Sequence, residues 1–267
     1  MHSIAAPFLD FGRVLGQMLR LYVESLAYLA VTIKEMAMSR KRRLAVYSSW
    51  MEQIYWIGNK SVSIVLSTIA FVGMISIVEM SYQMNRVLHS TDFVPGFAAL
   101  IIFREFASVI PASMMAGKVG AGITAEVGSM QITEQIDAMR LISLNPVKYL
   151  VVPRFVACTV SLVLLSSIAS LVAFATAMAV TSHKLGISPE MFINTALFFI
   201  KPEDIWINLF KAFVFGQIIP IIAAHYGFHT RGGAEGVGLA CTKSVVYSGL
   251  VIVILDFYIT WAATVFL

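Results

Sequence analysis

Charged residues are scarce in this 267-residue chain: Asp, Glu, Lys and Arg together make up 13% of it, about half of what an ordinary soluble domain carries. Hydrophobic residues make up 58%, and the mean hydropathy is +0.82. A soluble protein of this length needs many more charged side chains to cover its surface. The composition therefore excludes an ordinary soluble domain and predicts an integral membrane protein.

Cysteine is nearly absent. The two cysteines, Cys158 and Cys241, stand alone, with no CxxC pair and no histidine at ligand spacing. We therefore expect neither a disulfide framework nor a zinc site. The hydrolase motifs HExxH and GxSxG are absent as well. We expect no catalytic residue, no metal and no enzymatic activity in this chain.

Nucleotide-binding motifs are also missing. Two glycine-rich stretches, 117–122 and 232–238, lack the order GxxxxGK[ST] of a phosphate-binding loop. No cofactor is therefore expected on this chain. The formal charge of +4 comes mainly from short basic blocks such as the run at 40–43. Such blocks are typical of membrane topology signals, so we do not expect nucleic acid as a partner.

Long apolar stretches dominate what is present. Five of them have the length and composition of membrane-spanning helices, at approximately 62–82, 96–116, 155–181, 205–228 and 244–266. Lipid offers no hydrogen-bond partners to open strands, and these runs are too long and uniform for the strands of a barrel. The predicted fold class is an all-α integral membrane protein with about five transmembrane helices.

Residues 1–50 have a different pattern. Their longest apolar stretch, 21–33, is only about 13 residues long and is interrupted by Glu24, whereas a crossing helix needs about 20 residues. We predict one or two amphipathic helices that lie along the membrane surface. The alternative is a sixth crossing by residues 14–33. The N-terminus lacks the order of a signal peptide, so we expect it to be retained.

The positions of Lys and Arg predict the orientation. If the basic run at 40–43 is cytoplasmic, the opposite loops contain only Arg86, Lys184 and Lys201. The segments on the same side as that run contain more cations: Lys118, Arg140, Lys148, Arg154, Arg231 and Lys243. This places the N-terminus inside and the C-terminus outside.

Two connections between the spans are predicted to be structured. In the cytoplasmic segment 117–153, Ser129 is a candidate N-cap, and Ile132, Ile136 and Met139 follow at helical spacing until Asn145-Pro146. This pattern predicts a short amphipathic helix beneath the membrane. The outer segment 187–200 predicts a second surface helix.

Ionisable residues inside the spans are costly unless they are paired or hydrated. Four such residues are informative: Glu79, Arg104, Glu105 and Asp256. Arg104 and Glu105 are adjacent on a helix and cannot face each other. They either pair with other helices or border a polar cavity for the headgroup of an amphiphile. For Asp256 we expect a packing contact.

Small residues recur every four positions in the third span, at Ala169, Ala173 and Ala177. Such a ridge allows close helix packing. The sequence leaves open whether the ridge packs within the chain or between two copies of it.

Four long motifs are similar to those of one family. They are REFASVI at 104–110, AGKVGAGITAEVGSMQITEQIDAM at 116–139, NPVKYLVVPRF at 145–155 and GAEGVGLACTKSVVYSGLVIVILDF at 233–257. The chain resembles the MlaE (YrbE) family of ABC permeases over approximately residues 50–267. This resemblance implies an MlaE-type permease domain at 51–267, with the coupling segment at 117–153.

The resemblance also implies function and partners. We expect a homodimeric permease in the bacterial inner membrane, bound to cytoplasmic ABC ATPase subunits and to a periplasmic MCE-domain protein. A small STAS-domain protein accompanies several such ATPases. The expected substrate is phospholipid or another hydrophobic molecule. The alternatives are a permease for a small solute and a membrane scaffold without transport.

Matched motif by motif, the resemblance assigns residues to roles. Glu126, Glu134, Gln135 and Asp137 are expected at or near the ATPase contact. Arg104 and Glu105 match the RE dipeptide near the lipid cavity, and Glu79 is added to the expected substrate site. The chain departs from the family pattern in Lys118, where Arg is usual, and in a shorter outer loop after the third span.

Overall fold

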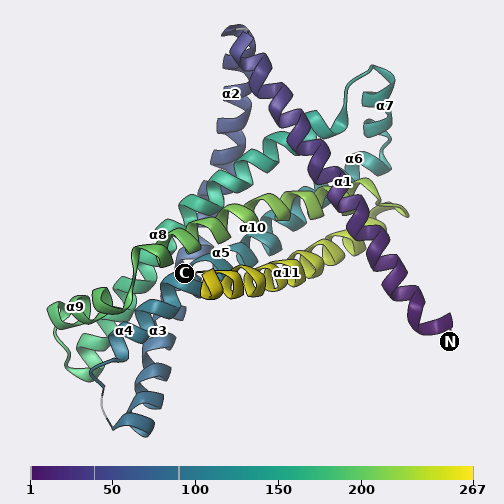
Figure 1. Cartoon of the computed structure of the whole chain (residues 1–267). Coiled ribbons are helices and arrows are strands. Elements are labelled where there is room, and N and C mark those ends of the chain that lie inside the picture. The colour runs from purple at the N-terminus through teal and green to yellow at the C-terminus, as the bar shows by residue number, and fades with distance from the viewer. Residues whose placement is uncertain (1, 39, 90, 267) are drawn as a thin grey trace. The chain divides into compact units, whose positions relative to one another are not determined.

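The computed structural model describes residues 2–38, 40–89 and 91–266, and within these residues it contains helices and no strand (Figure 1). The predicted all-α membrane protein is confirmed. In the described part of the chain, six helical stretches are long and apolar enough to cross a membrane, namely Val14–Met38, Val46–Val87, Val94–Ile132, Val147–Leu185, Pro202–Phe228 and Gly233–Phe266.

Five of these stretches contain the five predicted spans. The sixth, Val14–Met38, has the lowest mean hydropathy of the six, 1.2. It belongs to α1 (His2–Met38), one continuous helix that is followed by α2 (Arg40–Ile54). The interfacial position of residues 1–50 stays a prediction.

The chain divides into two compact units. Unit 1 comprises residues 1–57, 116–158 and 217–249, and unit 2 comprises 58–115, 159–216 and 250–267. Three long helices contribute residues to both units. They are α8 (Val152–Leu185), α10 (Pro202–Phe228) and α11 (Gly233–Phe266).

In unit 2, α3 (Lys60–Leu88) packs closely on α8. The alanine ridge of α8 is fully buried, and the Cβ of any residue replacing Gly73 of α3 would lie 2.5 Å from the carbonyl oxygen of Ala173. The Thr176 hydroxyl donates a hydrogen bond to the Ala70 carbonyl, 3.1 Å away. The small-residue ridge therefore packs within the chain, which answers the question that the sequence left open.

Segment 187–200, in unit 2, contains a helix, as predicted. Helix α9 (Pro189–Phe199) begins after Ser188, whose hydroxyl accepts the backbone N–H of Met191. It packs against α4 (Val94–Ile101) (Figure 1). The ring centroids of Phe199 and Phe97 are 4.9 Å apart in this contact.

In unit 1, α1 lies on a small core formed by Val151, Phe155, Ile221 and Ala224. Polar contacts add to this packing. The Asn145 amide donates to the Tyr28 hydroxyl at 2.6 Å, and the Glu35 carboxylate pairs with Lys148 at 2.8 Å. These contacts hold α1 against residues 145–148.

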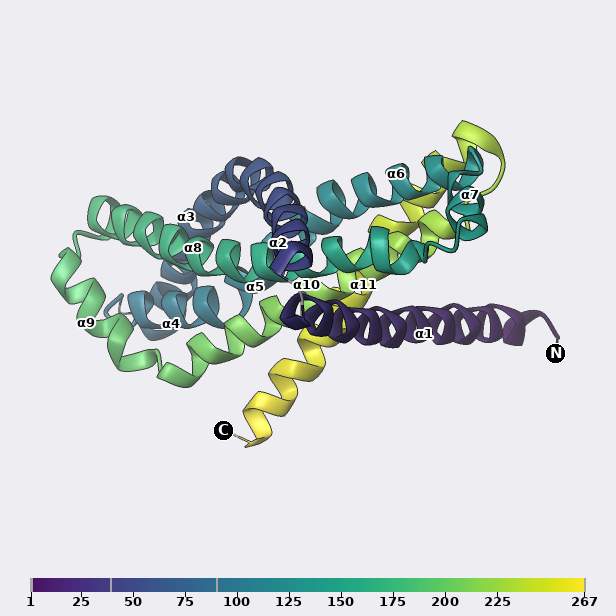
Figure 2. The same cartoon turned by 90° about the horizontal axis from the view of Figure 1, so that it is seen from above.

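The predicted single helix in segment 117–153 is wrong in its details. The chain instead forms two helices, α6 (Ala121–Ile132) and α7 (Gln135–Leu141), which follow each other in Figure 2. Ser129 is not an N-cap, because it lies inside α6 and its carbonyl accepts the N–H of Thr133. Glu134, at φ 58°, breaks the helix there. The remaining short elements of the chain are the π-helical turns η1 (Tyr55–Asn59), η2 (Ile102–Phe106), η3 (Ala116–Gly120) and η4 (Val147–Val151), and α5 (Ala107–Met115).

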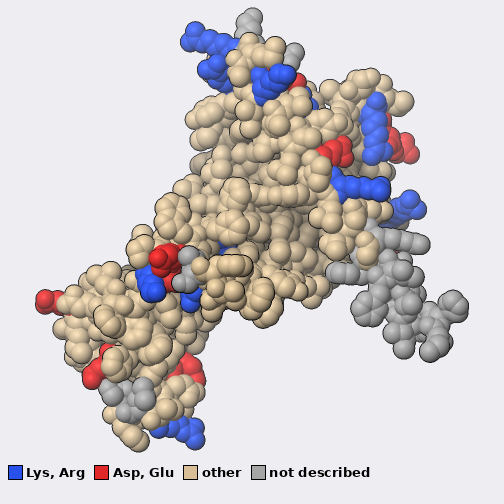
Figure 3. Space-filling view, in the orientation of Figure 1, with Lys and Arg blue, Asp and Glu red and all other residues tan. Residues whose placement is uncertain are grey.

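Charged side chains are few on the surface. On the face that Figure 3 shows, they form small separate groups, with wide uncharged areas between them. Many large apolar side chains are exposed, among them Phe71, Leu171 and Phe257. Exposed apolar side chains in such number are expected where helices contact lipid.

Candidate functional site

A buried lysine is the centre of the most polar site in unit 2. The Lys211 side chain has no exposed surface, although it lies on α10, a helix apolar enough to cross a membrane. Its Nζ lies 2.8 Å from Oε2 of Glu105, 2.7 Å from Oδ1 of Asp256 and 2.9 Å from the carbonyl oxygen of Arg104. One ammonium therefore joins α10 to η2 and α11.

Arg104 and Glu105 are neighbours in the π-helical turn η2, and adjacent residues on a helix point to different partners. Such a turn places an extra residue in the helix and redirects the side chains on it, often at functional sites. Glu105 points to Lys211, whereas Nε of Arg104 lies 3.2 Å from Oδ1 of Asp204. The second oxygen of Asp204 accepts the backbone N–H of Lys201 at 2.9 Å. Neighbours in sequence are thus fixed by two separate ion pairs.

A hydroxyl completes the arrangement. Oγ1 of Thr260, one turn after Asp256 on α11, donates to Oε1 of Glu105 at 3.2 Å, so both oxygens of Glu105 are bound. We call this set the charged cluster: Arg104, Glu105, Asp204, Lys211, Asp256 and Thr260. Its partners come from three helical segments, so it links them more specifically than apolar packing would.

Two cavities border the cluster. A small polar pocket of about 120 Å³ is lined by Leu100, Arg104, Phe199, Lys201, Glu203, Asp204 and Ile207. An apolar groove of about 580 Å³ is lined by Glu203, Trp206, Ile207, Phe210, Tyr258, Ile259, Ala262, Ala263 and Phe266. The two cavities share Glu203 and Ile207, so a polar pocket adjoins a groove whose lining is almost entirely hydrocarbon.

Of the three residues predicted for the substrate site, two lie in the charged cluster. Arg104 and Glu105 are both in the charged cluster, and Asp256 makes the interhelical contact that was expected of it. Glu79 is exposed on α3, and its carboxylate accepts a hydrogen bond from Gln83, one turn further on. No hydrogen bond or ion pair joins Glu79 to the charged cluster within the described residues.

Lys211 and Asp204 were missed by the sequence analysis. Lys211 is the one Lys or Arg in the predicted span 205–228, and an ionisable residue inside such a span is a functional candidate by default. The signal was therefore present. Asp204 lies one residue outside that span, and only the fold brings it to Arg104.

The four residues expected at the ATPase contact are all exposed. Glu126 of α6 projects to the surface, and its carboxylate pairs at 2.6 Å with the buried guanidinium of Arg154. Glu134 and Gln135 lie at the turn into α7. Asp137 pairs with Arg140 at 2.9 Å, one turn along the same helix. Their role at a partner stays a prediction.

Two apolar residues next to these were not predicted. Leu141 ends α7 with 87% of its surface exposed, and Ile142 follows with 68%. Ile136 on the same helix is fully buried and holds α7 in place. An exposed apolar pair beside charged residues is a feature of contact surfaces.

No group of three or more His, Cys, Asp or Glu side chains in the described part of the chain is arranged to hold a metal ion. The polar groups of the charged cluster bind mainly to one another. They are therefore suited to holding helices together and to contacting a charged ligand at the partly exposed Arg104.

Comparison with known proteins gives consistent similarities. The family model described as Permease MlaE matches residues 50–262. A probable ABC transporter permease protein of Synechocystis sp. is 37% identical over 211 residues, which cover 79% of this chain and 80% of the relative. Another probable ABC transporter permease protein, of Porphyra purpurea, is 37% identical over 202 residues, or 74% of this chain and 75% of the relative.

A third relative has a different kind of name. Protein TRIGALACTOSYLDIACYLGLYCEROL 1, chloroplastic, of Arabidopsis thaliana is 34% identical over 210 residues, which cover 79% of this chain and 60% of that protein. The region matched by the family model includes the whole charged cluster and both α6 and α7.

Proposed function

The chain belongs to the MlaE family of permeases, and from that premise we propose that it passes phospholipid between the inner membrane and a periplasmic MCE-domain carrier. As an ABC transporter permease it is a transport subunit, and the family implies a partner subunit that hydrolyses ATP. The relative from Arabidopsis thaliana is named after a galactolipid, which favours a lipid over a soluble solute.

One observation carries the proposal: a polar pocket at the charged cluster adjoins an apolar groove in the same unit. The pocket offers the partly exposed Arg104 and the ammonium of Lys201. The groove offers Trp206, Phe210 and Phe266. A ligand that fills both needs a polar head and a hydrocarbon tail, which describes a lipid and not a small polar solute.

We expect ATP hydrolysis in the partner to act on this chain through α7. The coupling residues predicted on α6 and α7 are three exposed carboxylates and one amide, and Leu141 and Ile142 add exposed apolar surface beside them. We infer that α7 docks on the ATPase subunit, with the apolar pair in a groove of that partner. Movement of a rigidly docked helix can then be passed to the helices connected with it.

A homodimer is the proposed assembly. Within the apolar part of α11 only 6% of residues are buried, and Val246, Val253 and Trp261 are among those exposed. Much of this helix therefore lacks an intramolecular partner, and a second copy can cover it. An MCE-domain protein and a STAS-domain protein complete the proposed set of partners.

The test begins with the full transporter purified in mild detergent from its host, with its proteins and lipids identified by mass spectrometry. We expect an ATPase, an MCE-domain protein and bound phospholipid. Arg104→Gln removes one of the pocket's two cations, and Ala262→Trp fills the groove. Each should lower the bound phospholipid severalfold while the complex stays intact. The matched controls are Arg86→Gln and Thr264→Trp, at exposed positions outside both cavities.

Other outcomes assign other functions. Recovery of a soluble-solute binding protein in place of the MCE-domain protein would favour the small-solute permease. Absence of any ATPase would favour the scaffold. Unchanged lipid in both cavity variants would leave the charged cluster as a packing device and refute its place in a lipid site.

A further inference from the structure

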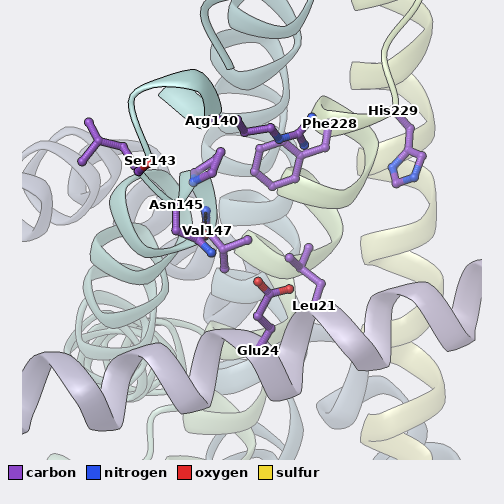
Figure 4. Close-up of a pocket in the computed structure, with 10 residues that line it drawn as sticks. Leu21, Glu24, Arg140, Ser143, Asn145, Val147, Phe228 and His229 are labelled. Carbon is purple, nitrogen blue, oxygen red and sulfur yellow. Dashed lines mark hydrogen bonds between the residues drawn. The ribbon is translucent and has the colours of Figure 1, made fainter. Parts of the chain in front are cut away.

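A second polar cavity, in unit 1, shares no residue with the charged cluster. It lies between α1, the segment after α7 and the end of α10, and its volume is about 510 Å³ (Figure 4). Its apolar walls come from Leu21, Leu144, Pro146, Val147 and Phe228, and its polar groups from Glu24, Arg140, Ser143, Asn145 and His229.

Opposite charges stand on opposite sides of this cavity. In Figure 4, Glu24 rises from α1 on one side, and Arg140 lies beside Phe228 on the other. Nη1 of Arg140 pairs with Asp137, but both side chains are more than half exposed, so this pair is weak and leaves other N–H donors free. Within the described residues, the Glu24 carboxylate has no hydrogen bond or ion pair.

His229 contributes a further polar atom. Its Nδ1 lies 2.7 Å from the carbonyl oxygen of His225, and a carbonyl only accepts, so Nδ1 carries the proton. The other ring nitrogen, Nε2, is thereby left for a ligand. Asn145 is already used, since its oxygen accepts the N–H groups of Val147 and Lys148 and its amide donates to Tyr28.

In a neighbouring cavity the charged groups are paired with each other. It has a volume of about 650 Å³ and shares Ser143, Leu144 and Asn145 with the first. Its acid and base, Glu35 and Lys148, pair directly at 2.8 Å. The charges of the first cavity have no such pairing with each other, and a ligand with both a positive and a negative group would complement them.

Helix α1 also has apolar surface outside the cavity. Leu19, Val23 and Leu26 are exposed, on the face of α1 opposite to Leu21 and Glu24. In a membrane protein such side chains face acyl chains. A ligand with a zwitterionic head and hydrocarbon chains therefore matches the opposite charges and the apolar walls of the cavity.

We propose that this cavity binds the headgroup of a zwitterionic aminophospholipid, with its ammonium on Glu24 and its phosphate on Arg140. The lipid would fill the space between α1 and the segment that follows α7. It would be a resident lipid, separate from the molecule transported. The proposal requires a membrane around the chain but does not depend on what the transporter carries.

The test uses the full chain in nanodiscs that contain equal fractions of phosphatidylethanolamine, phosphatidylcholine and phosphatidylglycerol. After the chain is released from the nanodisc, native mass spectrometry identifies by headgroup the lipids that it retains. The wild-type chain should retain phosphatidylethanolamine preferentially, because its ammonium can donate hydrogen bonds to a carboxylate. Glu24→Gln should lower this retention roughly three- to fivefold, the effect of one partly exposed ion pair.

Charge reversal sharpens the experiment. Glu24→Lys should change the preference to phosphatidylglycerol, which has no cation. Glu52→Gln and Glu52→Lys, on the exposed α2, are the matched controls and should leave the pattern unchanged. Wild-type retention by both Glu24 variants, or equal losses in the Glu52 variants, would overturn the proposal.

Two further results separate this proposal from the others. Arg104→Gln should leave the resident phosphatidylethanolamine in place even where it lowers the bound substrate lipid, so either proposal can fail alone. Binding of the ATPase subunit should also leave it in place. If the ATPase instead displaces the lipid, the cavity belongs to that partner and the lipid assignment is wrong.

Discussion

Removal of the Lys211 ammonium is the most direct test of the charged cluster. Lys211→Met keeps most of the side-chain volume but leaves the carboxylates of Glu105 and Asp256 facing each other without their shared cation. Both oxygens in question lie within 2.8 Å of Nζ, and the lysine is fully buried. Loss of one partner of a buried pair typically costs about 3–5 kcal/mol, because the remaining charge stays desolvated.

The expected loss is large enough to measure. For a chain of this size each kcal/mol lowers the midpoint of thermal unfolding by about 2–4 °C, so Lys211→Met should lower it by roughly 10 °C. The assay is thermal unfolding of the purified chain in detergent, followed by size-exclusion chromatography. Lys184→Met, an exposed lysine in the last turn of α8, is the control and should shift the midpoint by less than about 2 °C.

A compensated variant tests the physical reason. If the cost arises from unpaired carboxylates, the triple variant Lys211→Met, Glu105→Gln, Asp256→Asn should recover most of the lost stability, because no uncompensated charge is left. If Lys211→Met unfolds within about 2 °C of the wild type, or if the triple variant is no better than the single one, the argument from buried ion pairing is refuted.

Two further predictions concern helix contacts. Gly73→Ala should destabilise the chain by about 1–3 kcal/mol, because the new Cβ would lie 2.5 Å from the Ala173 carbonyl oxygen. Gly117→Ala is the control, because no atom lies within 4 Å of its Cβ. It should be neutral or slightly stabilising in the same assay. Asn145→Ala should cost about 1–2 kcal/mol through the lost cap of η4 and should speed limited proteolysis of α1. Tyr28→Phe, which removes only the bond to α1, should speed proteolysis with a smaller loss of stability. Equal behaviour of Gly73→Ala and Gly117→Ala, or an unchanged cleavage rate in Asn145→Ala, would contradict these assignments.

The positions of the spans were predictable from the sequence. A helix that faces lipid must be apolar for about 20 residues, so its pattern is local and needs no knowledge of its neighbours. The predicted span 96–116 accordingly lies within Val94–Ile132, and 205–228 within Pro202–Phe228. The cost of a charge in lipid is local in the same way, and this is why Arg104, Glu105 and Asp256 could be selected before any partner was known.

Pairings between helices depended on the tertiary structure. The partner of Glu105 is 106 positions away, at Lys211, and no periodicity within either helix specifies that contact. The same holds for the alanine ridge, which could equally have served a dimer until Gly73 was found against Ala173.

Local geometry set a further limit on prediction. Ser129 is a residue type that often caps a helix, but here the residues before it are already helical. They belong to α6, which packs on α10, where the Thr124 hydroxyl donates to the Ala223 carbonyl at 3.1 Å. The helix breaks instead at Glu134, whose left-handed backbone conformation is not predicted by its residue type. The sequence alone thus determined which segments are helical and which spans contain ionisable residues. The tertiary structure decided which of these residues are buried and which helices they connect, because each such contact joins residues distant in the chain.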